Sequence, residues 1–411
     1  MNLNFIRRIW MPQCSTLLLL LCLLPQQTSG QHTGEAVTIG QVETIHSGIL
    51  REDRDLLIYT PPDYATSEMR YPVVYLIDAD DHFHHATGAI RLLADNNLIP
   101  PLIVVGIRNT DRVRDLLPSG DKEMQESSPT SGGGENFLRF MKEELMPQID
   151  RRYRTQPYRI LIGHSFGGVM AVYAFLYEPA LFQASLVIDP SLWWNNDALV
   201  KQAAAYFETP KPGNHFMYLT VNNADSYSVA QCWALAHNLW ENDPSESGTP
   251  GVGVEIHPMD GVTHGTISFR SVYDGLEAIF QDWQIPDIGQ IVTEGGINGV
   301  DRFYETLSKK YGFTIPASEM SVSSAGSILL DLKRNEEAIA VFKRLVASFP
   351  ESVDALNAAG DGYQRLGSLE QAKGYYERAV ARAEQGPHMN RPSTRGRLQG
   401  LLRKMGAQNK P

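Results

Sequence analysis

The sequence predicts an α/β domain, with a mostly parallel sheet covered by helices on both faces, followed by a smaller all-helical region. Three observations support this fold class. Apolar, strand-like runs alternate with helical patterns between about Gln41 and Pro286, as in parallel sheets with two covered faces. One of these runs ends in a serine flanked by glycines and leads into a helical pattern. The last part of the chain repeats every 34 residues, which is typical of paired helices.

The strand-like segments follow one another in a regular order. Branched and aromatic residues bounded by turn residues predict strands at 42–46, 56–59, 73–78, 101–107, 159–163, 184–189, 216–221 and 253–257. The first two are short and polar residues separate them, so we expect an antiparallel edge. Apolar spacing predicts helices at about 86–96 and 135–152, and helical patterns also separate the later strands.

The first 30 residues have the pattern of a signal peptide. Arg7 and Arg8 precede a short apolar run at 17–24, and small residues follow at 28–30. The apolar run is too short to span a bilayer. We therefore expect an exported protein, periplasmic or secreted, with no stable membrane insertion after cleavage.

The net charge restricts the classes of binding partner, and the cysteine content restricts the disulfides that are expected. Without the signal peptide the chain keeps 34 basic and 47 acidic residues, a net charge of −13. This balance argues against nucleic acid and anionic membrane surfaces as partners. Cys14 and Cys22 lie in the signal segment, so only Cys232 would remain and no internal disulfide is expected.

The sequence pattern changes at two places along the chain, and we interpret both as boundaries between segments. We expect the α/β domain at 31–286, because the strand and helix alternation ends there. A segment punctuated by glycine and proline follows at 287–317, which we interpret as a surface linker with one short helical piece near 300–311. A helical domain is expected at 318–411.

The helical domain resembles a tetratricopeptide array. Ala338 matches Ala372 and Phe342 matches Tyr376 at the tetratricopeptide offset. The small residue lets two helices approach, and the aromatic ring fills the seam. Two repeats are few for independent stability, so we expect them to lean on the α/β domain and to end in a basic capping helix at 394–405.

The segment Gly163-His164-Ser165-Phe166-Gly167 is a G-x-S-x-G sequence between a predicted strand and a predicted helix. This is the context of a nucleophile elbow. The turn is strained, so a side chain at Gly163 or Gly167 would collide with its neighbours. The turn lifts the Ser165 hydroxyl off the sheet, and the helix start points backbone N–H groups at the same place. We predict that Ser165 is a nucleophile.

A serine nucleophile needs a base, and the base needs a carboxylate that orients it. His264 lies in a loop after the last predicted strand and before the final helix, which is where this fold places the base. For the acid three residues compete. Asp225 follows the preceding strand and is favoured, Asp260 lies just before His264, and Asp189 follows the strand after the elbow.

The oxyanion hole requires two backbone donors. We expect one from Phe166, right after the nucleophile, and one from the loop after the strand ending at Ile77, where we choose Asp80. The run His82-Phe83-His84-His85 invites a metal interpretation, but its spacing fits no common zinc site and serine chemistry needs no metal. No metal and no cofactor are expected.

Beyond the elbow, several segments carry a family resemblance. They are Asn109-Thr110-Asp111-Arg112-Val113-Arg114-Asp115, the segment from Glu144-Leu145-Met146-Pro147 to Thr155 in and after the predicted helix before the elbow, and Ile188-Asp189-Pro190-Ser191-Leu192-Trp193-Trp194. Over about 41–285 the chain resembles the esterase branch of the α/β-hydrolases, which includes esterase D-like and enterochelin esterase-like enzymes. The resemblance implies Ser165 as nucleophile and His264 as base, and it supports Asp225. The tail is similar to extensions found on some bacterial members.

The substrate is less closely defined. Arg112 and Arg114 lie on a loop after a strand, on the side where sites of this fold form. They would hold an acidic group of a substrate, or else pair with Asp111 or Asp115 to fix the loop. Trp193 is expected to wall an acyl or aromatic pocket. The resemblance implies a small-molecule ester, with thioesters and siderophore-type lactones among the substrates of relatives.

Two functions compete at this point. The first is a serine hydrolase that cleaves carboxylic esters through a Ser-His-Asp triad and an acyl-enzyme. The alternative is a binding or scaffold protein that acts through its tetratricopeptide tail and carries a silent hydrolase domain. Two interpretations of the tail stay open: it binds a protein partner or a second copy of the chain, or it is an appendage that stabilises the α/β domain.

Overall fold

The computed structural model describes residues 36–119, 121–208, 215–241, 252–385 and 391–408. The predicted signal peptide lies outside these residues. Within them, no helix has the length and apolar content needed to cross a bilayer.

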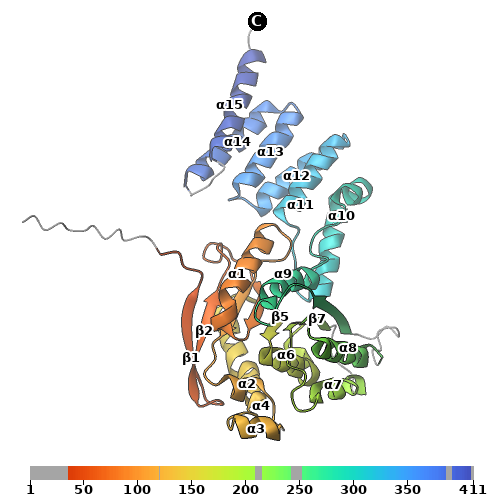
Figure 1. Cartoon of the computed structure of the whole chain (residues 1–411). Helices are drawn as coiled ribbons and strands as arrows, with labels where there is room; N and C mark the ends of the chain where they lie inside the picture. Colours follow the sequence, from red (N-terminus) through yellow and green to blue (C-terminus); the bar gives the residue numbers. More distant parts are fainter. Residues whose placement is uncertain (1–35, 120, 209–214, 242–251, 386–390, 409–411) are drawn as a thin grey trace, which may run out of the picture. The chain divides into compact units, whose positions relative to one another are not determined.

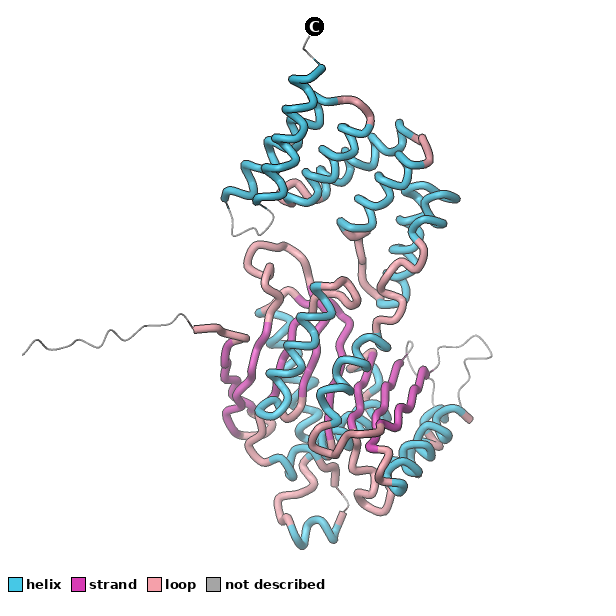
Figure 2. The backbone as a smooth tube through the Cα atoms, turned by 45° about the horizontal axis from the view of Figure 1, so that its top comes forward, coloured by secondary structure: helices cyan, strands magenta, loops and turns pink. Residues whose placement is uncertain are grey.

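An eight-stranded sheet forms the centre of the α/β domain (Figures 1 and 2). Its strand order is β1-β2-β4-β3-β5-β6-β7-β8. The β1–β2 and β2–β4 pairs are antiparallel and all other pairs are parallel. The predicted parallel sheet with an antiparallel edge is therefore confirmed. The strands are β1 (Gln41–Ser47), β2 (Glu52–Tyr59), β3 (Tyr71–Leu76), β4 (Ile103–Ile107), β5 (Thr155–His164), β6 (Ala184–Ile188), β7 (His215–Asn222) and β8 (Val252–Met259).

The central strands are apolar throughout because both of their faces are covered. Side chains alternate between the faces of a strand, and in β5 Ile160 and Ile162 enter one buried cluster while Leu161 enters the other. Helices α1 and α9 cover the first face, and α4 to α8 supply the second cluster. This two-sided burial explains why these strands are continuous apolar runs.

Helices fill the connections between strands. The predicted helix at 86–96 begins earlier, at Ala79, and the predicted helix at 135–152 contains one π-helical turn, η1. The helical elements of the α/β domain are α1 (Ala79–Asp95), α2 (Arg112–Leu116), α3 (Lys122–Ser127), α4 (Gly134–Phe140), η1 (Met141–Leu145), α5 (Met146–Arg152), α6 (Phe166–Tyr177), η2 (Pro179–Leu181), α7 (Ala198–Ala203), η3 (Tyr206–Glu208), α8 (Ser226–Trp240) and α9 (Ile267–Ile279).

The segment expected to be a linker is mostly helix. The 24-residue helix α10 (Ile288–Tyr311) occupies it, whereas the sequence predicted only a short piece. Gly296 interrupts the helix with φ 57° and ψ −149°, a conformation that only glycine adopts easily. The glycines that suggested a linker therefore mark a kink within a helix.

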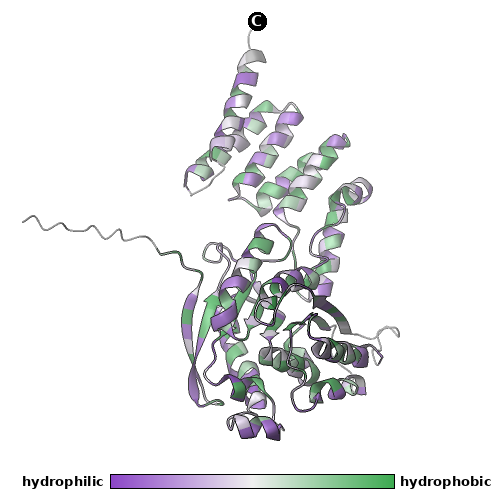
Figure 3. Cartoon of the chain, in the orientation of Figure 1, coloured by the Kyte–Doolittle hydropathy of each residue, from purple (hydrophilic) through white to green (hydrophobic). Residues whose placement is uncertain are grey.

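The tail folds as paired helices, and Figure 3 shows the alternating polar and apolar bands of these helices. Ala338, Ala372, Phe342 and Tyr376 are all buried, as the repeat predicted. A Cβ atom at Gly326 would lie 2.7 Å from the Phe342 ring, so the glycine makes room for the ring. The tail helices are α11 (Glu319–Asp331), α12 (Asn335–Ser348), α13 (Val353–Arg365), α14 (Leu369–Gln385) and α15 (Arg391–Gln408).

Helix α10 packs against the α/β domain through aromatic residues. The Tyr311 hydroxyl donates to the carbonyl of Ile279 at 3.1 Å. Its ring lies 5.2 Å from that of Tyr158 and 5.4 Å from that of Phe280. One apolar cluster runs from the sheet through this contact into the repeats, so the repeats share a core with the α/β domain.

Candidate active site

Ser165 sits on a sharp turn between β5 and α6. Its backbone has φ 59° and ψ −115°, a strained conformation for a residue with a side chain. The Ser165 N–H donates to the carbonyl of Ile188 in the neighbouring strand at 3.0 Å. The turn is thereby anchored to the sheet while the hydroxyl stands at the carboxyl end of β5.

Small residues around the turn allow close approach of two backbones. A Cβ atom at Gly163 would overlap the carbonyl group of Gly167, as the sequence predicted. At Gly167 the nearest atom to such a Cβ would lie at 3.2 Å, so the constraint there is milder than expected. Gly168 is tighter, because its Cβ would lie 2.8 Å from the Cβ of Pro190.

His264 lies between β8 and α9 and pairs with a buried carboxylate. Its Nδ1 lies 2.7 Å from Oδ2 of Asp189. The His264 side chain is 54% exposed, whereas that of Asp189 is only 7% exposed. If Nδ1 carries the N–H that faces Asp189, Nε2 is unprotonated, which is the tautomer that a general base requires.

Asp189 is held from several sides at the end of β6. Its N–H donates to the carbonyl of Thr220 at 2.7 Å, and its Oδ1 accepts the N–H of Asn222 at 3.0 Å. Its φ of 40° turns the chain sharply after the strand. The carboxylate therefore has one oxygen fixed by the backbone and the other free for His264.

The expected pairing of His264 with Asp225 is wrong. Asp225 is the N-cap of α8, where its carboxylate accepts the amide of Tyr227 at 3.2 Å and the amide and hydroxyl of Ser228 at 3.3 and 2.7 Å. These bonds from Ser228 lower the pKa of Asp225. Asp260, the second candidate, accepts the Asn223 side-chain amide at 2.8 Å. Asp189, the third, is the partner in the structure.

Ser165 and His264 line one pocket of about 330 Å³. The Ser165 hydroxyl lies 3.3 Å from the hydroxyl of Ser191, a neighbour that the sequence did not single out. Catalytic hydrogen bonds are often loose without substrate, so this contact is compatible with a resting nucleophile. The full lining is Ser165, Phe166, Asp189, Pro190, Ser191, Trp193, Asn222, Asp225, Ser228 and His264.

Two further histidines lie close to His264. The ring of His164 is 4.5 Å from that of His264 and 5.3 Å from that of His82. Burial, and to a lesser degree the neighbouring His264, lowers the pKa of His164 to about 4. Burial also lowers the pKa of His82. Both rings therefore stay neutral near pH 7 and add no positive charge beside His264.

The two expected oxyanion donors have different positions. The Phe166 N–H belongs to the first turn of α6, where amides lack an intrahelical acceptor, and Phe166 lines the pocket. Asp80 lies in the first turn of α1 but does not line this pocket. Its carboxylate accepts Nε of Arg108 at 2.6 Å.

Arg112 is a structural ion-pair partner in this structure, and does not line the pocket. Its guanidinium binds both oxygens of Asp78 at 2.8 Å, and lies 5.2 Å from the centre of the Phe166 ring. Arg112 does not make the expected alternative pair with Asp111 or Asp115, whereas Arg114 makes it, with its Nε 2.7 Å from Oδ1 of Asp115. Asp78 is 2% exposed and begins α1 beside the elbow, so Arg112 fixes the loop that precedes α1.

Trp193 lines the pocket as predicted. Its side chain is 44% exposed, and its ring meets that of Phe166 edge to face at 6.0 Å. Among the residues that the structure describes, no group of three or more His, Cys, Asp or Glu side chains is placed to hold a metal ion.

Comparison with known proteins assigns the two parts of the chain to known families. The profile of the "Putative esterase" family matches residues 47–244, and tetratricopeptide profiles match 325–352 and 353–385. Ferri-bacillibactin esterase BesA of Bacillus subtilis is 30% identical over 219 residues, which is 48% of this chain and 71% of that protein. Siderophore triacetylfusarinine C esterase of Aspergillus fumigatus is 27% identical over 191 residues, 44% of this chain and 61% of that protein.

A solved structure extends the comparison. The IroE-like serine hydrolase from Shewanella oneidensis superposes with a TM-score of 0.61 and 27% identity, covering 75% of this chain and 99% of that one. The fold, the elbow and the relatives agree. The chain therefore belongs to the putative esterase family, is a carboxylic ester hydrolase, and carries a tetratricopeptide extension.

Proposed function

We propose that Ser165, His264 and Asp189 form a catalytic triad that hydrolyses carboxylic esters. Ser165 Oγ bonds to the ester carbonyl carbon while its proton passes to Nε2 of His264. The π electrons of the carbonyl move onto its oxygen. Asp189 holds Nδ1–H and stabilises the imidazolium that forms.

The intermediate then collapses in the usual order of serine hydrolysis. The C–O bond to the alcohol breaks, and His264 returns the proton to the departing oxygen. Water attacks the acyl-enzyme by the same route and releases the acid and free Ser165. The Phe166 N–H is proposed as one oxyanion donor and the backbone N–H of Asp80 as the other.

The observation that carries this proposal is the 2.7 Å contact of His264 with the buried Asp189 in the pocket that holds Ser165. Hydrolysis of p-nitrophenyl esters of increasing acyl length, wild type beside Ser165→Ala, tests it. We expect activity only in the wild type, and fluorophosphonate labelling that Ser165→Ala abolishes. Equal turnover by both proteins would contradict the serine mechanism.

The names of the relatives support a narrower substrate proposal. They are esterases of ferri-bacillibactin and triacetylfusarinine C, so siderophore-type cyclic esters are the proposed class, with thioesters as the competing one. Comparing kcat/KM for a cyclic trilactone, a simple ester and a thioester of the same acyl group would decide. A thioester preference would overturn the lactone assignment.

Export and the tail complete the proposal. The signal-like N-terminus supports a periplasmic or secreted location, which cell fractionation with an antibody to the mature chain would test.

The repeats support a protein partner or self-association. If the tail were the functional part, Ser165→Ala would leave the function of the protein in the cell intact. We expect Ser165→Ala to abolish that function.

A further inference from the structure

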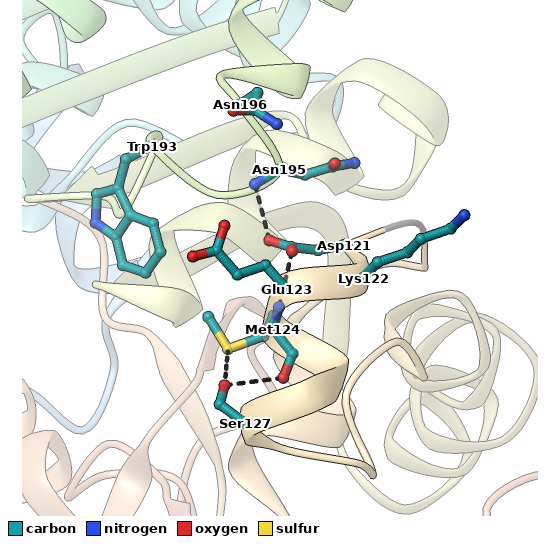
Figure 4. Close-up of a pocket in the computed structure, with 8 residues that line it drawn as sticks. All are labelled: Asp121, Lys122, Glu123, Met124, Ser127, Trp193, Asn195 and Asn196. Atoms are coloured by element: carbon teal, nitrogen blue, oxygen red, sulfur yellow. Dashed lines mark hydrogen bonds between the residues drawn. The ribbon is translucent and has the colours of Figure 1, made fainter.

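A second, larger pocket adjoins the one that holds Ser165. It has a volume of about 550 Å³, and Trp193 is the only residue that lines both pockets. A single ligand bent around this indole would therefore reach both. The lining consists of Asp121, Lys122, Glu123, Met124, Ser127, Trp193, Asn195 and Asn196 (Figure 4).

Two elements build the pocket, and Asp121 ties them together. Its Oδ1 accepts the N–H of Met124, as the N-cap of α3, at 2.9 Å. Its Oδ2 accepts the N–H of Asn195 from the loop after Trp193, at 3.0 Å. Both carboxylate oxygens of Asp121 are thus engaged by backbone N–H groups of the pocket lining. The helix and the loop are held at a fixed distance, with the indole between this pocket and the serine.

The loop on the far wall has an unusual backbone. Asn195, Asn196 and Asp197 have φ values of 49°, 52° and 61°. Three successive left-handed residues that are not glycine are costly, and Asn and Asp tolerate the conformation best. This turn brings the two asparagines to the pocket rim, where their amides can bind a polar group.

Glu123 supplies a free negative charge at this pocket, and Lys122 a positive one. Within the described part of the chain no hydrogen bond or ion pair engages the Glu123 carboxylate. Figure 4 shows that carboxylate directed toward Trp193, while the ammonium of Lys122 points away from the indole. A carboxylate and a half-exposed indole ring both attract cations, and both disfavour an anion. The chemistry of the pocket therefore selects for positive charge.

We propose that this pocket, with Trp193 and Glu123 as its selective elements, binds an amine-bearing, positively charged arm of an ester whose carbonyl lies at Ser165. The inference rests on the proposed esterase function and adds a charge preference to it. The ester carbonyl occupies the smaller pocket and the arm passes the indole. An anionic arm of the same length meets the Glu123 carboxylate instead.

Matched esters test the proposal. Each set shares one acyl group and one alcohol and differs only in a terminal trimethylammonium, a carboxylate or a neutral amide on a spacer of increasing length. One series carries the arm on the acyl side and the other on the alcohol side. The readout is the ammonium-to-carboxylate ratio of kcat/KM, measured on the full chain.

In the wild type we expect a ratio on the order of fivefold to tenfold at the best spacer length. Each exposed ion pair contributes little energy, but attraction of the ammonium and repulsion of the carboxylate both raise the ratio. The effect should lie in KM, since the arm does not change at the transition state. Glu123→Lys should invert the ratio. Glu126→Lys is the matched control, because Glu126 is exposed on the same helix but does not line the pocket.

Three outcomes would overturn the inference. They are a wild-type ratio near one in both series, a ratio that Glu123→Lys leaves unchanged, and an equal shift in the Glu126→Lys control. Failure of the esterase proposal is separate, since it appears as no hydrolysis of the neutral ester above Ser165→Ala. In that case, calorimetric binding of the same charged esters to Ser165→Ala still measures the ratio.

Discussion

Asp189→Asn distinguishes the acid found in the structure from the acid favoured by the sequence. Oδ1 of Asp189 accepts the N–H of Asn222 at 3.0 Å, and Oδ2 faces Nδ1 of His264 at 2.7 Å. In the variant the amide oxygen must stay on the Asn222 side, because an NH₂ group there would meet another donor. The NH₂ group then faces His264, whose Nδ1 must accept. The proton moves to Nε2, where it blocks transfer from Ser165.

The size of the loss follows from the lost charge. An imidazolium and a carboxylate about 4 Å apart at an effective dielectric constant near 20 attract by about 4 kcal/mol. That corresponds to roughly a thousandfold in rate. The wrong tautomer adds to this, and a comparable change in another serine hydrolase costs about 10⁴ in kcat. We expect kcat for Asp189→Asn to fall by about 10³ to 10⁴.

The assay is p-nitrophenyl ester hydrolysis at saturating substrate, with Asp225→Asn as the matched control. Both substitutions remove one carboxylate charge near the pocket. Asp225→Asn keeps an N-cap residue on α8, and we expect a loss below about tenfold. Thermal unfolding of both variants checks that neither loss reflects misfolding. A larger loss in Asp225→Asn than in Asp189→Asn would refute the assignment of the acid.

Three further predictions concern stability. Asp115→Asn should destabilise the fold by about 3 kcal/mol in urea unfolding, because its carboxylate binds the fully buried Arg54 guanidinium at 2.6 Å; an unchanged midpoint would contradict this. The second prediction concerns His164, whose pKa is lowered to about 4 in the folded protein, whereas an unfolded histidine titrates near 6.5. Between these pH values the unfolded state binds more protons than the folded state. The free energy of unfolding should therefore fall by about 2–3 kcal/mol as the pH drops from about 6.5 to 4. His164→Phe should flatten that slope in pH-dependent melting. Gly326→Ala should cost about 1–3 kcal/mol, because its Cβ would lie 2.7 Å from the Phe342 ring; calorimetric melting that matches the wild type would exclude this contact.

Much of the fold could be predicted because its signals are local and repeated. Two-sided burial makes each central strand a continuous apolar run, and a fixed helix pairing leaves a fixed repeat in the tail. The elbow is equally local, since strand, glycine, Ser165 and helix are adjacent in sequence. The place of His264 followed from strand order alone. Helix α10 was underestimated because Gly296 produces a kink, and a glycine pattern does not distinguish a kink from a linker.

The carboxylate that pairs with His264 could not be predicted, because strand order leaves open which aspartate it is. Asp189 and Asp225 both follow parallel strands, β6 and β7, at the same edge of the sheet. What separates them is hydrogen bonding. Asp225 is followed by a helix whose first amides it caps, whereas the residues after Asp189 include Pro190, which has no amide hydrogen to offer. Asp189 therefore turns to Asn222 and His264.

The same reasoning explains why Arg112 is an ion-pair partner within the protein and not a substrate-binding residue in this structure. A charged residue near a pocket does not by itself indicate that it binds a ligand. A side chain serves the substrate only if the protein has not already neutralised it. Arg112 is engaged by Asp78, and the Asp80 carboxylate by Arg108. Glu123 differs, because no side chain in the described structure neutralises it beside the half-exposed ring of Trp193. Where local partners are absent, a charge stays available for a ligand, and the test of that idea is the reversal of substrate charge preference in Glu123→Lys.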